Sequence, residues 1–301
     1  MILNKRVPFT LLLRKIKFQL PVIFGYSILV EILDEFYHIK NMSMPLNIPT
    51  FLGTTISLVL AFRTGQAYNR WWEARKVWGA IVNDSRSLVR QIYTLTLRQT
   101  DEQFEQVQKN FAYRQMAWVH ALGQALRGIL DKEALRKYLP ENEWEFVTKQ
   151  KNIPNAILQI HSQQLQQAAK QGWYEPNQQV CIETTISRLC DSMGKCERIK
   201  NTVFPRIYSV FVHIMLYTFL LLLPFGLIDY FGYIEALIIV TLTTPFFMLE
   251  KAAIVMQDPF ENSVHDVPVT ALAQTIELNL RQMLEEDFVP EPAKDYGYYV
   301  L

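Results

Sequence analysis

The sequence predicts an all-α membrane protein with four transmembrane helices and a large helical region outside the bilayer. Half of its 301 residues are hydrophobic and 20% are charged. This is more apolar material than a soluble domain carries and more charge than a bundle of membrane helices carries. Four apolar segments approach the roughly 20 helical residues that span a bilayer core of about 30 Å. The polar segments between them have the apolar periodicity of amphipathic helices, so we expect no β domain.

The four predicted spans form an irregular first pair and a more regular second pair. In the first pair, Pro21 and Glu31 interrupt one segment and Arg63 breaks the apolar run of the other. The second pair forms a hairpin whose turn is residues 229–232. The predicted bounds of the spans are 18–33, 51–72, 207–228 and 233–249.

Basic residues near the span ends predict the orientation of the chain, because Lys and Arg that flank a span stay on the cytoplasmic side. Such residues precede the first span, follow the second and precede the third: Lys5, Arg6, Arg14, Lys15, Lys17, Arg70, Arg75, Lys76, Lys195, Arg198, Lys200 and Arg206. In the connections 34–49 and 229–232, the only Lys or Arg is Lys40. We therefore predict that both termini and the middle region are cytoplasmic, and we expect no cleaved signal peptide.

The pattern divides the chain into four regions. These are a basic segment with the first two spans (1–72), a cytosolic helical region (73–205), the second pair of spans (206–249) and a cytosolic loop, helix and tail (250–301). The apolar stripe of the second span continues to Leu95, so we expect this helix to project below the membrane.

Start and stop signals predict the other helices of the cytosolic regions. Their expected positions are about 104–126, from Pro140 onward, from Pro154 to Gly172, 177–202 and 269–286. The last of these helices ends in acidic residues, where the helix macrodipole disfavours anions. We therefore expect Glu285, Glu286 and Asp287 to meet basic residues of another segment or chain.

The second span begins with small hydroxylated turns before its apolar run, unlike a helix that only faces lipid. Thr54, Leu58 and Phe62 lie one turn apart on one face, which forms a stripe suited to line something narrow. Packing inside a helical bundle is the alternative explanation of this stripe. The segment ends in a cation and two indole rings, which are typical of an anchor at the membrane–water interface. This predicted anchor comprises Arg70, Trp71 and Trp72.

Composition and motifs exclude several classes of function. A formal net charge of +1 gives no global field that attracts nucleic acid. No catalytic loop, nucleotide-binding glycine pattern or paired catalytic carboxylate stands out, so we predict neither an enzyme nor a cofactor. Cys181, Cys190 and Cys196 fit no common zinc or disulfide spacing and are predicted to be buried free thiols.

Two short motifs carry a family resemblance. Arg70-Trp71-Trp72-Glu73, which follows the segment 57–62, and Asp258-Pro259-Phe260, which follows the last span, resemble the bestrophin family of pentameric ion channels, in particular its bacterial members. The resemblance implies a homopentamer in the bacterial plasma (inner) membrane, with lipid and monovalent ions as its other partners.

The same resemblance implies positions for the pore. The neck of such a channel carries three rings of side chains, which here are Thr54, Leu58 and Phe62. Thr54 departs from the branched apolar residue that is common at the outermost ring, and its hydroxyl is expected to wet that end of the neck. A second constriction in the cytosolic region is expected at Val180.

Animal members of the family hold calcium in an acidic loop, and the corresponding loop of this chain is degenerate. Asp258 and Asp266 are present, but Ser263 stands where the clasp has its first carboxylate. Because a hard cation needs several oxygen ligands, we predict no calcium-dependent gating and no resident metal.

The resemblance implies an ion channel that favours cations over anions. Acidic residues near the predicted outer face favour cations as well, if they face the axis; they are Asp34, Glu35, Asp229 and Glu235. The alternatives are an anion (chloride) channel of the same fold and a membrane-anchored helical scaffold that conducts nothing. A transporter is a further class, but no inverted repeat is visible. His213 also lies in a predicted span, where ionisable groups are rare and often functional.

Overall fold

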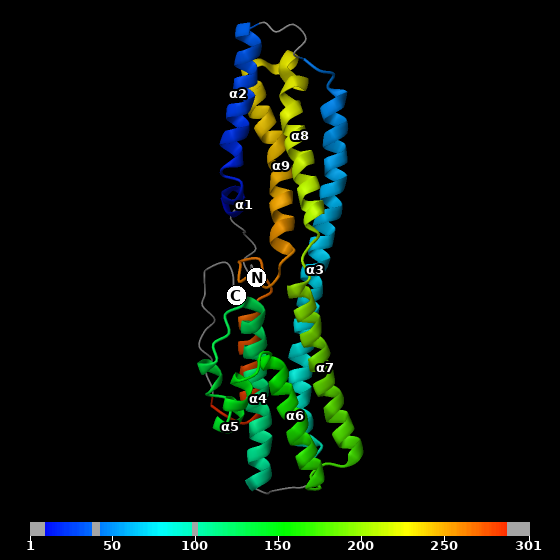
Figure 1. Ribbon diagram of the computed structural model, residues 1–301, viewed down its shortest axis with the longest axis vertical. Helices are drawn as coiled ribbons and strands as arrows, with labels where there is room; N and C mark the ends of the chain where they lie inside the picture. Colours follow the sequence, from blue (N-terminus) through cyan, green and yellow to red (C-terminus); the bar gives the residue numbers. More distant parts are fainter. Residues whose placement is uncertain (1–9, 38–42, 98–101, 288–301) are drawn as a thin grey trace. The chain divides into compact units, whose positions relative to one another are not determined.

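The computed structural model of the chain describes residues 10–37, 43–97 and 102–287, which form helices and no strand (Figure 1). The longer helices are α2 (Gln19–Tyr37), α3 (Asn47–Thr94), α4 (Glu102–Arg127), α6 (Ile153–Lys170), α7 (Pro176–Asn201), α8 (Arg206–Phe231), α9 (Glu235–Met256) and α10 (Val269–Met283). The short elements are α1 (Thr10–Lys15), α5 (Glu141–Thr148) and the 3-10 helices η1 (Glu133–Leu135) and η2 (Gly232–Ile234). The predicted all-α fold is confirmed.

The chain folds into two compact units. The apolar unit comprises the described residues up to Arg70 together with Val203–Asp258. The helical body comprises Trp71–Thr202 and the described residues from Pro259 onward. Helix α3 has 48 residues and contributes its first part to the apolar unit and its second part to the helical body.

Apolar side chains of α2, α3, α8 and α9 form the core of the apolar unit. Its buried members include Ile23 of α2, Ile56 and Leu60 of α3, Leu216 of α8 and Ile239 of α9, all of them at most 1% exposed. In Figure 1, α2 and α9 lie on one side of α8 and α3 lies on the other.

Two glycines allow α3 and α8 to pack closely. A Cβ atom on Gly53 would lie 3.2 Å from the ring of Phe219, and one on Gly226 would lie 2.8 Å from Cγ of Pro49. Small residues at such positions let two apolar helices approach each other, which is the usual packing device of membrane helices.

Within the described residues, two helices are long and apolar enough to cross a membrane by length and composition, namely α8 and α9. The two other predicted spans are also helical: they form α2 and the first part of α3. Charged residues lower the hydropathy of these two, since α2 carries Glu31 and α3 carries Arg63. Both pack with α8 and α9 in the apolar unit.

The helical body has a separate apolar core that contains the fully buried Trp78, Phe111 and Trp118. Polar contacts join its helices as well. The guanidinium of Arg114 on α4 donates to both carboxylate oxygens of Glu143, at 2.8 and 2.6 Å, and to the side-chain oxygen of Gln164, at 2.6 Å. Arg114 therefore ties α4 to α5 and α6.

The predicted signals mark the ends of the helices in the body. Gly128 and Gly172 follow α4 and α6 with φ of 68° and 78°, a conformation that glycine adopts without steric cost. At the start of α6, the side chain of Asn152 accepts a hydrogen bond from the amide of Asn155 at 3.1 Å. Pro154 stands in the first turn of the same helix.

Two predictions about single residues had different outcomes. Of the three acids after α10, Glu286 meets a basic residue of another helix, since it lies 3.3 Å from Lys109 of α4, and it also contacts Arg281 of α10 itself at 2.9 Å. The expectation for Glu285 and Asp287 stays a prediction. The three thiols are free, but only Cys196 is buried, whereas Cys181 and Cys190 are exposed. The prediction of three buried thiols was wrong because α7 packs one face on the body and leaves the other outside. Lys5, Arg6 and Lys40 of the orientation argument lie outside the described residues.

Candidate pore surface and flanking polar sites

The face of α3 that carries Thr54, Leu58 and Phe62 is exposed in the apolar unit. Leu58 is 75% exposed and Phe62 is 60% exposed, and Thr54 is exposed as well. Phe51, one turn earlier on this face, is also exposed. We call these four residues the α3 stripe. A continuous apolar surface of this kind marks contact with lipid or with further protein.

The opposite face of α3 makes the contacts with the rest of the apolar unit. Ile56, Leu60, Arg63 and Ala67 are buried on that face. At the edge between the two faces, the ring of Phe62 lies beside the ring of Tyr208, with centroids 6.3 Å apart. Packing within one chain therefore does not explain the α3 stripe.

Hydroxyl groups in the first turns of α3 bind the helix backbone. Thr54 donates to the carbonyl of Thr50 at 3.0 Å, and Ser57 donates to that of Gly53 at 2.9 Å. Thr55 makes the equivalent bond to Phe51 at 2.9 Å. Because the hydroxyl hydrogens are used inside the helix, these turns present oxygen lone pairs and methyl groups to their surroundings.

The expected cytosolic constriction residue lies in the helical body. Val180 stands in the second turn of α7 and is 65% exposed. It points away from the core of its unit, as a residue that faces an axis between chains would. Its role as a constriction stays a prediction.

The structure divides the predicted interfacial anchor between the two units. Arg70 belongs to the apolar unit, where its Nη2 lies 4.0 Å from Oδ1 of Asp258. Trp71 packs against the core of the helical body, and its indole nitrogen donates to the carbonyl of His265 at 2.9 Å. Trp72 is stacked on Trp71 and is exposed. Trp71 therefore has a structural contact, and the interfacial role of all three stays a prediction.

In the loop that resembles a calcium clasp, Asp266 bonds to its own turn. Its two carboxylate oxygens accept hydrogen bonds from the amide and the hydroxyl of Ser263, and the side chain is buried. The side chain of Asp258 accepts a hydrogen bond from Gln257 at 3.2 Å. Among the described residues, no three His, Cys, Asp or Glu side chains are grouped as metal ligands. The predicted insensitivity to calcium is untested.

A cluster of ionisable side chains that was not predicted surrounds the buried pair Arg63 and Glu250 in the apolar unit. Nη1 of Arg63 lies 3.6 Å from Oε1 of Glu250, and both side chains are 1% exposed. Nε2 of His213 lies 2.8 Å from the same oxygen, and Nζ of Lys251 lies 3.4 Å from Oε2. Arg63 also donates to the hydroxyl of Ser209 at 3.0 Å.

A sequence signal for this cluster exists. Arg63 and His213 lie inside two of the predicted spans, and Glu250 directly follows the last one. Charged groups in such segments pair with one another, because an isolated charge is costly away from water. Pairing the single anion among them with the two basic groups would have predicted the contact.

A second missed network surrounds Glu277 in the helical body. Its carboxylate accepts hydrogen bonds from Tyr138 at 2.7 Å and from Nε of Arg281 at 3.0 Å, and it lies 2.8 Å from Nε2 of His120. Burial alone raises the pKa of Glu277, but the hydrogen bonds from His120, Tyr138 and Arg281 and the charge of His120 together outweigh burial and lower the pKa to about 2. The network joins α10 to α4 and to the segment after η1.

One of the four acids expected at the outer mouth is not available to a pore. Glu235 is 2% exposed at the start of α9. Glu35 and Asp229 are exposed, and Asp34 is half-buried. Glu235 therefore does not add to the exposed negative charge that would attract cations.

Comparison with known proteins covers nearly the whole chain. Residues 10–282 match the family described as bacterial/fungal bestrophin protein. A relative from Escherichia coli K12, the voltage-dependent anion channel-forming protein YneE, is 30% identical over 96% of this chain and 93% of its own length. A protein of the same description from Ralstonia nicotianae is 29% identical over 85% of this chain and 84% of its own.

Solved structures give the same result. The chain is similar to the crystal structure of a bacterial bestrophin homologue from Klebsiella pneumoniae, with a TM-score of 0.85 and 26% identity, over 91% of this chain and all of that one. The resemblance inferred from two short motifs is thus confirmed over most of the sequence, and the protein is an all-helical membrane protein. By the match over residues 10–282, the chain belongs to the bacterial and fungal bestrophin family.

Proposed function

We propose that the chain is the subunit of an ion channel whose narrow neck is formed by the α3 stripe. The observation that carries the proposal is the exposure of Leu58 and Phe62, at 75% and 60%, on a helix whose other face is fully packed. The Escherichia coli relative is named as a channel-forming protein, which supports the same class of function for this chain.

Rings of apolar side chains can control the passage of ions. A sufficiently narrow apolar tube expels water, and an ion cannot lose its hydration shell without replacement ligands. Leu58 and Phe62 would form two such rings one turn apart, and a small widening would admit water. At the outermost ring, Thr54 would supply an oxygen lone pair in place of a third apolar side chain.

A ring requires several copies of the chain around one axis. We propose a homopentamer, as the family resemblance implies, in the bacterial inner membrane with both termini in the cytoplasm. In this assembly Val180 forms the second constriction, and Arg70, Trp71 and Trp72 set the depth of α3 in the bilayer. The loop 258–266 holds no regulatory calcium, because Asp266 already bonds to Ser263.

The proposal includes a preference for anions. It rests on the names of the relatives in Escherichia coli and Ralstonia nicotianae, which are described as anion channel-forming. The sequence-based expectation of cations has no support from these relatives. A cation channel remains the second candidate, since Glu35 and Asp229 are exposed acids.

Recordings from planar bilayers test the neck. We expect Leu58→Ala and Phe62→Ala to increase the open probability or the conductance over the wild type. The matched control is Val22→Ala, an equally exposed apolar residue of α2, which should leave the current unchanged. If the wild type and both neck variants are silent in bilayers, the scaffold function replaces the channel.

The sign of the permeant ion needs a separate measurement. In a potassium chloride gradient, an anion channel reverses near the chloride equilibrium potential. Reversal near the potassium equilibrium potential would reject the anion preference and leave the channel itself intact. The same recordings, made at several holding potentials, show whether this chain shares the voltage dependence in the names of its relatives.

A further inference from the structure

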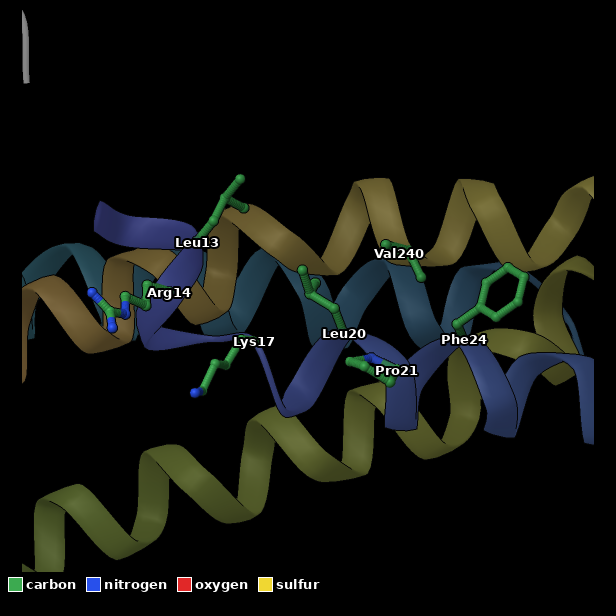
Figure 2. A pocket seen from close by; sticks show the side chains of 7 residues that line it. All are labelled: Leu13, Arg14, Lys17, Leu20, Pro21, Phe24 and Val240. Carbon is green, nitrogen blue, oxygen red and sulfur yellow. The ribbon is translucent and has the colours of Figure 1, made fainter. Parts of the chain in front are cut away.

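The apolar unit contains a groove on the side of α2 and α9, which shares no residue with the α3 stripe. Its volume is about 540 Å³. Leu20, Pro21 and Phe24 line it from α2, and Val240 lines it from α9. Figure 2 shows these apolar side chains along most of its length.

One end of the groove is cationic. Arg14 of α1 and Lys17, in the turn after α1, line this end, whereas Phe24 lies at the other (Figure 2). Both cations are exposed. In the described part of the chain, no carboxylate forms an ion pair with either of them. Their positive charge is therefore available to a ligand.

The break between α1 and α2 creates this arrangement. Helix α1 ends at Lys15, and the amide of Gln19 bonds to the carbonyl of Ile16 at 3.0 Å. Ile16 is fully buried in the core of the apolar unit, which fixes the turn while Lys15 and Lys17 stay outside. The ammonium of Lys17 lies 4.7 Å from the centre of the Phe18 ring. The turn thus holds cations beside exposed apolar surface.

We propose that this groove binds one anionic phospholipid of the surrounding bilayer, with its phosphate at Arg14 and Lys17 and one acyl chain along Leu20, Phe24 and Val240. The cationic end of the groove matches the phosphate of such a lipid, and its apolar length matches an acyl chain. Basic pockets between membrane helices on the cytoplasmic side are suited to anionic headgroups, and the orientation proposed above puts Arg14 on that side. A free phosphate would leave the apolar length of the groove unused.

The probe is phosphatidylglycerol, with phosphatidylcholine as the neutral comparison, added to the full chain in detergent. Retained lipid is counted on the intact protein by native mass spectrometry. We expect the wild type to retain phosphatidylglycerol in preference to phosphatidylcholine. Removal of each cation should weaken the preference about fivefold, since a basic residue near an anionic surface contributes about 1 kcal/mol. Arg14→Ala/Lys17→Ala should then bind the two lipids alike.

Lys15→Ala is the matched control, because Lys15 is an exposed cation on the same turn but does not line the groove. It should keep the preference. An equal loss in Lys15→Ala would show diffuse attraction of charge and would overturn the proposal, as would unchanged retention in the double variant. Unaltered elution on size exclusion establishes that the variants are folded.

A photo-crosslinking phenylalanine analogue at position 24 identifies the occupant of the groove directly. Illumination in vesicles that contain phosphatidylglycerol should give a lipid adduct of the single chain. A cross-linked dimer in place of the lipid adduct would mean that a second copy covers the groove, and it would reject the lipid site.

Discussion

Glu277 and Glu250 are buried carboxylates that are stabilised in different ways. Glu277 lies in the helical body, where Tyr138, His120 and Arg281 surround both of its oxygens with donors. Glu250 lies in the apolar unit beside Arg63, at the longer distance of 3.6 Å. At the residue scale, Glu277 depends on hydrogen bonds to both of its oxygens, whereas Glu250 depends on the buried cation of Arg63 and on the shorter contact of 2.8 Å with His213.

Replacement of Glu277 by Gln should destabilise the helical body. The variant loses the charge that the three partners bind, at a cost of roughly 2–4 kcal/mol in the free energy of unfolding. Because the pKa of Glu277 falls from 4.5 to about 2, its contribution is present above pH 4.5 and is lost as the pH falls toward 2. Thermal melts between pH 7 and pH 3 should therefore show a difference between wild type and variant that shrinks in acid.

Glu145→Gln is the control for this change. Glu145 is an exposed carboxylate in a surface pair with Lys149 at 3.9 Å, and such pairs contribute little. Its melting temperature should match that of the wild type at every pH. A constant difference between Glu277→Gln and wild type down to pH 3 would contradict the assignment of the lowered pKa.

The Arg63–Glu250 pair predicts a non-additive pair of substitutions. Glu250→Leu alone leaves the buried Arg63 without its anion and should cost roughly 3–5 kcal/mol. Arg63→Met/Glu250→Leu should recover much of this loss, because no fully buried charge is then left unpaired. His213 and Lys251, which also contact Glu250, are partly exposed. Melting temperatures of the four proteins of the cycle in detergent measure the coupling. Additive losses would show that the two residues do not interact.

Single residues also show what sequence reasoning can reach. The α3 stripe follows from the period of one helix, so Leu58 and Phe62 could be identified without any knowledge of the fold. The partner of Arg63 could not, because Glu250 belongs to another helix and the distance between them depends on packing. The contact between Ser263 and Asp266 in the degenerate loop is more local than the Arg63–Glu250 contact, since its two residues are only three positions apart.

At the element scale, the helix ends were predictable because their signals are local. Gly128 and Gly172 adopt positive φ within two residues of the ends of α4 and α6, and Pro154 lies in the first turn of α6. The exposure of Cys181 and Cys190 was not predictable in this way. The face that a helix buries depends on its neighbours, and the sequence of α7 alone does not specify them.

The close approach of α3 and α8 makes Gly226 sensitive to a single methyl group. In Gly226→Ala, the new Cβ would lie 2.8 Å from Cγ of Pro49, so the helices must separate, at a cost of roughly 1–3 kcal/mol. Gly25→Ala in α2 is the matched control, since no atom lies within 4 Å of its new Cβ. The higher helix propensity of Ala should leave that variant as stable as the wild type or more so. Equal melting temperatures for the two variants would contradict this packing.

At the scale of the whole molecule, the fold class and the family could be inferred from apolar segments, charge bias and two motifs. The number of subunits and the sign of the permeant ion could not, because both depend on surfaces that meet between chains. The outer acids illustrate this limit: Glu235 was expected at a pore mouth and is buried beneath the surface of its own chain.

The proposed assembly predicts the mass of the detergent-solubilised protein. Light scattering corrected for bound detergent should give five chains of 35.2 kDa each. In this assembly, the exposed apolar residues of the α3 stripe from the five copies would face one another around the axis. A monomeric mass would remove the neck, since one α3 helix cannot enclose an axis.

The central claim is that the α3 stripe faces the path of the ions, and modification of a cysteine at position 58 tests it most directly. In a background with the exposed Cys181 and Cys190 replaced by Ser, Leu58→Cys should lose its bilayer current when a charged thiosulfonate reagent is added. Leu29→Cys, at an exposed position of α2, should keep its current. Current through Leu58→Cys that survives complete modification of the thiol would contradict the claim.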